Sequence, residues 1–302
     1  MSPQIWFITG ASSGFGRVAT EHVLAQGDIA VATLRKPEEL DDLKAKYGAD
    51  KLLVLKLDVT KTNEISQAFQ KAIDVFGRID VVFNNAGFGV FAEVEGSTDE
   101  AVRSLFDTNF FGAMNVSREA VRVFRDVNKP IGGRLLITSS VAGLSPVPII
   151  GYYAGTKHAL EGTTTTMVRE LDPDWNIKAS QPHLFAFRDR WLTLPRIQVT
   201  LIEAGSFETS GFGKATVCPP HPAYTKPTLP TVIGRNIFAD PNGPKLPFND
   251  LQKGVAKIYK LTTLDNPPLH FPLGKDTFPA VRKQIAALTK ALEEYESWSE
   301  DL

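Results

Sequence analysis

The sequence predicts an α/β protein with one doubly wound parallel sheet, Rossmann-like, and helices on both faces. Short apolar, β-rich runs alternate with segments of helical period, which is typical of consecutive βαβ units. A glycine-rich stretch joins the first strand run to the first helical segment. The chain has 302 residues, of which 43% are hydrophobic, and its composition does not shift from one part of the chain to another. We therefore expect a single domain over residues 1–302.

Six runs have the length and apolar character of buried strands, at residues 5–9, 29–34, 52–57, 79–83, 134–138 and 199–202. Helical periodicity is expected at residues 17–26, 40–46, 65–76, from about 99 onward, and from about 153 to 171. Ser97 and Glu100 form a capping-box pattern that predicts a helix start near Asp99. Two more helical patterns close the chain, at residues 251–260 and 278–298. Right-handed crossovers between these strands give a doubly wound sheet.

The net charge, the cysteine count and the lengths of the apolar runs argue against several classes of protein. A net charge of −1 argues against a nucleic-acid binder, which usually carries a basic face. Cys218 is the one cysteine, so no internal disulfide can form, and a reducing, cytoplasmic location is expected. No apolar run approaches the ~20 residues of a transmembrane segment, and no signal peptide is recognised. The five histidines show no metal-ligand spacing, so no metal is expected.

Two segments interrupt the rhythm. Residues 179–197 lie on a helix-to-strand connection, at the sheet's N-terminal edge, and are expected to be an inserted appendage or contact surface. Their aromatic side chains favour a contact with a partner or subunit, although sequence read through from an unspliced intron would look the same.

Residues 206–249 carry eight prolines and leave from the C-terminal edge, which predicts a substrate lid. Half-buried loop packing would account for the same apolar side chains, which are Phe207, Phe212, Val217, Tyr224, Leu229, Val232, Ile233 and Phe238.

A tyrosine and a lysine four residues apart, Tyr153 and Lys157, are the main candidates for chemistry. On a helix such residues share one face, and an ammonium beside a phenol lowers the phenol's pKa from about 10. The pair is therefore a candidate general acid/base. Tyr47 and Lys51 repeat the spacing, but they lie between a helix and the third strand, at the N-terminal edge. Ligands of open α/β sheets bind at the opposite edge, so this second pair is expected on the surface.

The glycine-rich stretch has the spacing Gly-x3-Gly-x-Gly, with Gly10, Gly14 and Gly16. Glycines let the backbone approach a pyrophosphate, and the helix that follows presents free N–H groups to its charge. A glycine cluster alone is more often a plain turn, but its place between the first strand and the first helix favours dinucleotide binding.

With these motifs in order, the chain resembles the short-chain dehydrogenase/reductase family over residues 4–178 and 198–210, and more loosely beyond. The matching motifs are Thr9-Gly10-x3-Gly14-x-Gly16, Leu57-Asp58-Val59-Thr60, Asn84-Asn85-Ala86-Gly87, Asn109, Ser139-Ser140-Val141-Ala142-Gly143 and Tyr153-x3-Lys157. The expected site residues therefore come from segments spread over most of the chain.

The resemblance implies a role for each catalytic residue. Tyr153 would exchange the proton, Lys157 would bind the ribose and lower the pKa of Tyr153, and Ser140 would hydrogen-bond the substrate oxygen. Asn109 would hold a water in a proton relay through Lys157. Ser140 is preferred to Ser139 because it lies thirteen residues before Tyr153, the family's usual interval.

A larger set of residues is expected to contact the cofactor. These residues are Gly10, Ser12, Ser13, Gly14, Phe15, Gly16, Arg35, Asp58, Val59, Asn85, Ala86, Gly87, Tyr153, Lys157 and Thr209. After the sixth strand, Ala204 stands where the family usually has proline, so the nicotinamide-side loop that contains Thr209 is expected to be looser.

The end of the second strand predicts NADP rather than NAD. No acidic residue follows this strand before Glu38, and Arg35 is placed for bidentate contact with a 2′-phosphate. Ser13 could donate to the same group. The alternative is that Arg35 and Lys36 are a solvated loop pair.

The predicted function is NADP(H)-dependent interconversion of a carbonyl and an alcohol on a lipophilic small molecule. Residues 32–35 and 267–274 resemble the branch that includes steroid- and retinol-dehydrogenase-like enzymes. Two alternatives stay open, an epimerase or dehydratase on the same fold, and a nicotinamide-binding regulator without turnover. The family also implies a homodimer or homotetramer formed through the helices that carry Asn109 and Tyr153.

Overall fold

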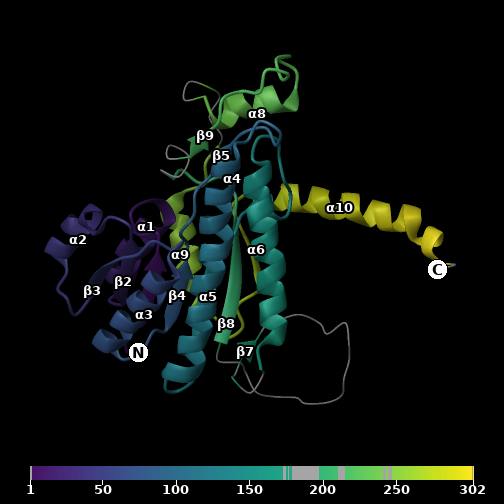
Figure 1. Cartoon of the computed structure of the whole chain (residues 1–302). Helices are drawn as coiled ribbons and strands as arrows, with labels where there is room; N and C mark the ends of the chain where they lie inside the picture. Colours follow the sequence, from purple (N-terminus) through teal and green to yellow (C-terminus); the bar gives the residue numbers. More distant parts are fainter. Residues whose placement is uncertain are drawn as a thin grey trace.

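The computed structural model describes residues 2–172, 175, 177–178, 197–209, 215–240, 243, 247–300 and 302. At its centre lies a parallel sheet with the strand order β10-β8-β6-β4-β1-β2-β3 (Figure 1). The strands are β1 (Ile5–Thr9), β2 (Ile29–Leu34), β3 (Leu52–Lys56), β4 (Val81–Asn84), β6 (Gly133–Thr138), β8 (Ile197–Ala204) and β10 (His270–Leu273). The order reverses between β1 and β4, which creates the switch point where open α/β sheets bind ligands. The predicted fold class and the six predicted strands are confirmed.

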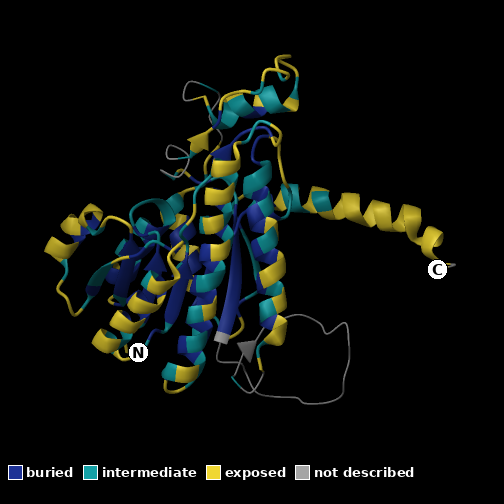
Figure 2. Ribbon diagram, viewed as in Figure 1, coloured by how far each residue is buried: buried dark blue, intermediate teal, exposed yellow. Residues whose placement is uncertain are grey.

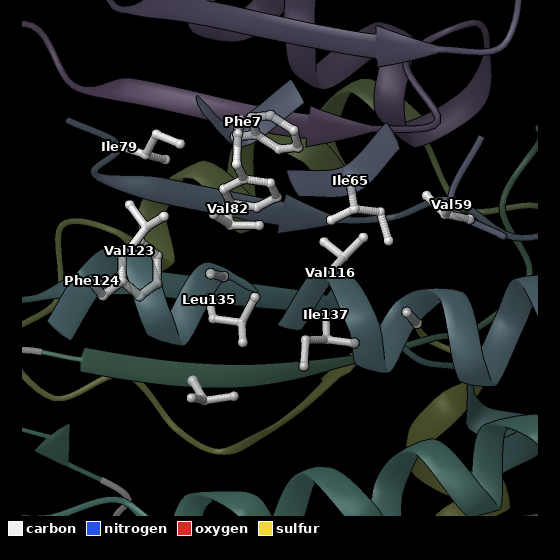
Figure 3. Packing of buried hydrophobic residues seen from close by; sticks show 14 of the residues in the cluster. Phe7, Val59, Ile65, Ile79, Val82, Val116, Val123, Phe124, Leu135 and Ile137 are labelled. Carbon is white, nitrogen blue, oxygen red and sulfur yellow. The ribbon is translucent and has the colours of Figure 1, made fainter. Parts of the chain in front are cut away.

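Two hydrophobic clusters hold helices against the two faces of the sheet. One cluster packs α3 (Thr62–Phe76), α5 (Ala113–Arg122) and α6 (Gly151–Glu170) on the first face. Figure 3 shows its centre, where Phe7 and Val82 of the sheet meet Val116 of α5. The second cluster packs α1 (Gly14–Ala25), α2 (Asp41–Lys46) and α9 (Leu251–Leu261) on the other face. Apolar burial on both faces explains why the strands read as continuous apolar runs.

The long helical stretch that begins near Asp99 is interrupted by one π-helical segment and ends in a second. It consists of α4 (Asp99–Phe106), η2 (Asp107–Gly112), α5 and η3 (Val123–Val127), and η2 and η3 are the π-helical parts. The expected capping residue was wrong. Thr98, not Ser97, caps α4 by accepting from the Ala101 N–H, while Ser97 donates its hydroxyl to the Glu93 carbonyl.

The seventh strand, β10, was not predicted. It is an edge strand that pairs with β8, and its four residues include Pro272. Proline cannot donate to a ladder, so it is tolerated at an edge, where one side of the strand needs no partner. The helix that follows, α10 (Thr277–Tyr295), and α9 were both expected from periodicity.

The predicted insertion at residues 179–197 lies, except for Ile197, outside the described residues. Its flanks are described. A short strand β7 (Ile177–Lys178) pairs in parallel with the start of β8, with Ile177 opposite Ile197. Ile197 is also opposite Gly133, the first residue of β6. The described residues on either side of this segment therefore lie at the N-terminal edge of the sheet, opposite the switch point.

The predicted lid at residues 206–249 is described except for 210–214, 241–242 and 244–246. It contains β9 (Thr216–Val217), which pairs with β5 (Val90–Phe91), and α8 (Pro230–Phe238). Figure 1 shows these elements together above the C-terminal ends of the strands. A bidentate ion pair fixes α8 to the body, because Arg235 contacts both oxygens of buried Glu93 and also donates to the Cys218 carbonyl. Hydrogen bonding from Arg235 lowers the pKa of Glu93 to about 2.

The apolar side chains of this segment have different roles. Phe238 packs with Phe91 and Tyr153 in one cluster, as a substrate lid requires. Phe207 instead is buried against Phe15, at the start of α1, and Gly254. Val217 and Ile233 are 49% and 47% exposed. The side chains of this segment therefore do not all line one pocket.

None of the helices in the described ranges combines the length and apolarity that crossing a membrane requires.

Candidate active site

The glycine loop between β1 and α1 leaves the helix start open to an anion. Gly10 and Gly14 have φ values of +68° and +54°, in the left-handed region that favours glycine. A Cβ on Gly16 would lie 2.2 Å from the Gly10 carbonyl oxygen, so the turn closes only with glycine there. Ser13, the N-cap, makes no side-chain capping bond, and the first turn of α1 carries no acidic residue. The N–H groups and the dipole of α1 therefore suit a phosphate.

A second turn is pinned against the first by Thr9. Its hydroxyl oxygen accepts from the N–H groups of Asn85 and Ala86, at 2.9 and 3.0 Å. The Asn85 side chain donates to the Thr9 carbonyl and accepts from the Thr138 hydroxyl. These bonds join the ends of β1, β4 and β6 into one rigid rim, and they place residues 85–87 beside the glycine loop.

Arg35 and Asp58 lie at the ends of β2 and β3. Arg35 is exposed and Asp58 is half-buried. Burial acts to raise the pKa of Asp58, but hydrogen bonds from Thr60 and the charge of Arg35 hold that pKa below its ordinary value. The Arg35 charge is thus near enough to act on Asp58, next to the buried Val59. An exposed guanidinium beside the sheet's C-terminal edge can receive a phosphate.

Tyr153 and Ser140 come together at the end of β6. Ser140 precedes the short helix η4 (Val141–Gly143), and its Oγ accepts from the Ala142 N–H at 3.1 Å. Burial raises the pKa of the Tyr153 phenol, and a hydrogen bond with Ser140 lowers it. Ser139 is 1% exposed, and its hydroxyl has no hydrogen-bond partner within the described chain. The geometry therefore brings Ser140, not Ser139, to the phenol.

Lys157 lies one turn after Tyr153 and is 4% exposed. Its Nζ donates to the Thr138 carbonyl at 2.7 Å and lies 5.7 Å from the centre of the Tyr153 ring. Burial lowers the pKa of Lys157 to about 8, although the negative charge of Glu161 acts to raise it. We expected Lys157 to lower the pKa of Tyr153. In this geometry the ammonium faces Thr138, and the net shift of the phenol's pKa is upward.

A charged cluster that the sequence analysis did not find lies behind Lys157. Glu161 of α6, Glu203 of β8 and His270 of β10 place one ligand-type atom each within 4.8 Å of one another. His270 Nδ1 lies 2.7 Å from Glu203 Oε1 and 3.4 Å from Glu161 Oε2.

The charge of His270 offsets part of the negative charge of the two acids. Hydrogen bonds with Glu161 and Glu203 raise the pKa of His270 to about 10, so the imidazole keeps its proton at neutral pH. This cationic ring acts as a counter-ion to the two buried carboxylates. The spacing of Lys157 and Glu161 was visible in the sequence, but the strand residues come from far away along the chain.

Asn109 lies in the π-turn η2 and is 1% exposed. Its Oδ1 accepts from the Phe88 N–H at 3.0 Å, and its Nδ2 donates to the Phe88 carbonyl at 2.8 Å. A Cβ on Gly87 would lie 3.0 Å from the same Oδ1. Both polar atoms of the side chain thus hold the turn after Gly87 in place.

The loop after β8 closes over the glycine loop. A Cβ on Gly14 would lie 3.2 Å from the Thr209 Cβ, so Thr209 lies directly against the start of α1. The Phe15 and Phe207 rings meet edge to face with centroids 4.9 Å apart. Ser206 is tied down as well, because its N–H donates to Asp276 at 2.8 Å. The looser loop expected from Ala204 is thus held at both Ser206 and Phe207.

Tyr47 and Lys51 do not form a comparable pair. Tyr47 is the extended residue that ends α2, so it shares no helix with Lys51. The Lys51 ammonium donates to the Gly27 carbonyl at 3.1 Å, at the sheet's N-terminal edge. The site thus contains Ser140, Tyr153 and Lys157 with the glycine loop, and leaves the second pair outside.

Several known proteins are similar to this chain in sequence and fold. Residues 4–184 match the family model described as short chain dehydrogenase. An uncharacterised oxidoreductase of Schizosaccharomyces pombe is 33% identical, over 95% of this chain and 87% of its own. A 3-ketodihydrosphingosine reductase of Bacteroides thetaiotaomicron is 36% identical over 57% of this chain and 60% of its own. A crystal structure of a short-chain dehydrogenase from Streptomyces avermitilis superposes with a TM-score of 0.82, at 28% identity, over 99% of this chain and 98% of that one.

Proposed function

The chain belongs to the short-chain dehydrogenase family of oxidoreductases, and from this premise we propose that it is an NADP(H)-dependent enzyme that interconverts a carbonyl and an alcohol. The observation that carries the proposal is the meeting of Ser140, Tyr153 and Lys157 at the end of β6. These three side chains lie at the C-terminal edge of the sheet, beside the open start of α1. A proton donor, its hydrogen-bond partner and a cation are thus together at the edge of the sheet where open α/β folds bind their ligands.

The proposed chemistry divides between the cofactor and the chain. A bound nicotinamide supplies or accepts the hydride. Ser140 donates its hydroxyl to the substrate oxygen and fixes that oxygen beside the phenol. Tyr153 gives its proton to this oxygen during reduction and takes it back during oxidation. The raised pKa of Tyr153 keeps the phenol protonated at neutral pH, which suits reduction.

Lys157 and Asn109 have supporting roles in this proposal. The Lys157 ammonium donates hydrogen bonds to the ribose hydroxyls of the cofactor. It also stabilises the negative charge that develops on the Tyr153 oxygen. Because the Asn109 side chain is bonded to Phe88, a proton relay at this residue would use its main-chain carbonyl.

We propose NADP rather than NAD as the cofactor, and Arg35 as the residue that selects it. The pyrophosphate would lie against Gly10, Gly14 and Gly16. The adenine would contact Asp58 and Val59, and the adenosine ribose would contact residues 85–87. Replacing Arg35 by Asp puts a carboxylate where the 2′-phosphate would lie, so kcat/KM with NADPH should fall and kcat/KM with NADH should not.

The control for this test is Lys36→Asp, which makes the same charge change one residue further on. NADPH binding, followed by its fluorescence, gives a readout that does not depend on turnover. Equal preference for NADH in the unmodified protein would contradict the NADP assignment, and equal effects at positions 35 and 36 would identify a solvated pair.

The proposed substrate is a lipophilic ketone, aldehyde or secondary alcohol. Phe91 and Phe238 pack in one apolar cluster with Tyr153, so apolar side chains adjoin the proposed proton donor. The bacterial relative that is named for reducing 3-ketodihydrosphingosine, a lipid ketone, supports the same class. The Glu93–Arg235 ion pair holds α8 over this cluster, which gives the lid a fixed inner wall.

A substrate panel tests the reaction and its rivals together. Long-chain 3-keto lipids, steroid ketones, retinal and short polar ketones would be followed at the NADPH absorbance band. Oxidation of NADPH with a preference for the lipophilic members is the expected result. NADPH binding without turnover across the panel would favour a regulator. Product formation without net cofactor oxidation would favour an epimerase or dehydratase. A cytoplasmic location, and association through α5 and α6, stay predictions of the sequence.

A further inference from the structure

The last long helix, α10, stands away from the body of the protein. Figure 1 shows it extending outward beyond α6, and Figure 2 shows it exposed along most of its length. Its main contacts are with β10 and η4. With 19 residues it is ~28 Å long. Most helices in proteins are stabilised mainly by packing of an amphipathic face, so a packing partner is expected.

One face of α10 carries an apolar stripe with spacings of three and four residues. The stripe consists of Phe278, Val281, Ile285, Leu288, Leu292 and Tyr295. Ile285, Leu288 and Leu292 are 57%, 57% and 72% exposed. The 3-4 spacing over nearly three heptads is that of the a and d positions of a coiled coil. In the described part of the chain, no element covers the outer half of this stripe.

We propose that α10 of one molecule pairs antiparallel with α10 of a second copy of this chain, as a two-stranded coiled coil related by a two-fold axis. In a two-fold interface each contact occurs twice, with residue i facing j and j facing i. The stripe can satisfy this condition with itself, because Ile285 and Leu288 before residue 290 are matched at equal distances by Tyr295 and Leu292 after it. The surface is separate from α5 and α6, where the family resemblance placed the subunit contact.

Charge along α10 selects the antiparallel direction. The basic residues Arg282, Lys283 and Lys290 come first along the helix, and the acidic residues Glu293 and Glu294 follow near its end, with Glu296 directly after it at the start of η6 (Glu296–Ser299). A parallel pair would place like charges at the same level. An antiparallel pair places the basic end of each helix beside the acidic end of the other.

The heptad positions give the register. With Phe278 at position a, both Arg282 and Glu296 occupy e positions, which flank the apolar seam. Thr289 is also an e position and lies midway between them in sequence. When Leu288 faces Leu292 of the second copy, Arg282 faces Glu296, and the two-fold axis passes next to Thr289. Two opposite-charge pairs form by symmetry, and the two bodies lie at opposite ends of the coil.

The first experiment measures the mass of the full-length protein in solution by sedimentation velocity over a concentration series. We expect a self-associating species that loses one association step in Leu288→Glu and in Leu292→Glu. A charge buried in the centre of an interface should weaken association by roughly 30-fold or more. Ala287→Glu is the matched control, because Ala287 is exposed on the outward face of the same helix and should change nothing.

The second experiment tests direction and register. Arg282→Glu and Glu296→Arg should each weaken association by roughly 2- to 30-fold, and the double variant should restore it. Thr289→Cys should cross-link to itself through a short bis-maleimide, and Ala287→Cys should not. The native Cys218 is buried, so it leaves a low background.

Several outcomes would overturn the proposal. A protein that is monomeric at high concentration would do so, and protection of α10 from hydrogen exchange in that monomer would show that the chain covers its own stripe. An oligomer that keeps its mass in Leu292→Glu would place the interface elsewhere. Association that is lost in Leu292→Glu but not rescued by the double charge reversal would overturn the antiparallel register. Because none of these readouts uses turnover, they are independent of the proposed reaction.

Discussion

Two tyrosine–lysine pairs with the same spacing lie at opposite edges of one sheet. Tyr153 and Lys157 share helix α6, with the ammonium 5.7 Å from the phenol ring and almost fully buried. Tyr47 ends helix α2 and Lys51 precedes β3, so a turn separates them, and the Lys51 ammonium bonds to the Gly27 carbonyl. The ammonium of Lys46 lies over the Tyr47 ring, with its Nζ 5.2 Å from the ring centre.

The difference between the two pairs shows that a spacing of four residues is not enough to define a catalytic pair. Four residues of separation bring two side chains together only when both are on one helix. A shifted pKa also requires burial and neighbouring charges, and only the pair on α6 has both Ser140 and Glu161 nearby. Both edges of the sheet have loops, but only the C-terminal edge collects the ends of β1, β4 and β6.

The largest effect is expected for Tyr153→Phe, with Tyr47→Phe as the matched variant. Loss of the phenol hydroxyl should reduce kcat/KM for ketone reduction by about 10² to 10⁴-fold, the usual contribution of a general acid. NADPH binding should survive, because the ring remains. Tyr47→Phe should leave both quantities unchanged. Turnover retained in Tyr153→Phe, or lost in Tyr47→Phe, would remove the distinction between the two pairs.

A smaller effect is expected for Lys157→Met compared with Lys51→Met. Removal of the buried ammonium should lower kcat/KM by about 10²-fold, because developing charge on the phenol oxygen is no longer stabilised. Lys51→Met should be silent in steady-state kinetics. Equal losses in the two variants would point to a shared effect on folding, which circular dichroism would reveal.

The smallest effect is a shift in pH dependence for Glu161→Gln. The charge of Glu161 raises the pKa of Lys157, which burial lowers to about 8. Without this charge the pKa of Lys157 falls further, so the ammonium is lost at lower pH. The alkaline limb of kcat/KM should therefore move to lower pH, while the value near pH 6 stays the same.

The control for this shift is Glu170→Gln, at the exposed end of α6. A loss that is equal at every pH would show that Glu161 acts on the structure rather than on the charge of Lys157.

The sequence predicted the sheet well because each buried strand carries its own signal. Apolar runs bounded by glycine or charged residues gave six strands in the right order. The edge strand β10 was missed because His270 and Pro272 interrupt its apolar pattern, and only pairing with β8 makes it a strand. The π-turns were missed because their backbone bonds differ from those of an α-helix without any change in side-chain type.

The candidate site shows the same division between local and distant signals. Ser140, Tyr153 and Lys157 lie within eighteen residues of one another, so a motif could identify them. Glu203 and His270 join Glu161 only because β8 and β10 are neighbours in the sheet. The hydrogen bonds between the Asn109 side chain and the Phe88 main chain also depend on tertiary packing. The sequence around Asn109 does not indicate them.

Asp276 has a consequence for communication across the molecule. One of its carboxylate oxygens accepts from the Ser206 N–H, in the loop that lies over the start of α1, and the other accepts from Asn249. The next residue, Thr277, begins α10. A tilt of α10 that moves Asp276 would therefore also move the loop over the start of α1. By thermodynamic reciprocity, a ligand that shifts this loop through the same contacts would shift the preferred angle of α10 with the same coupling free energy.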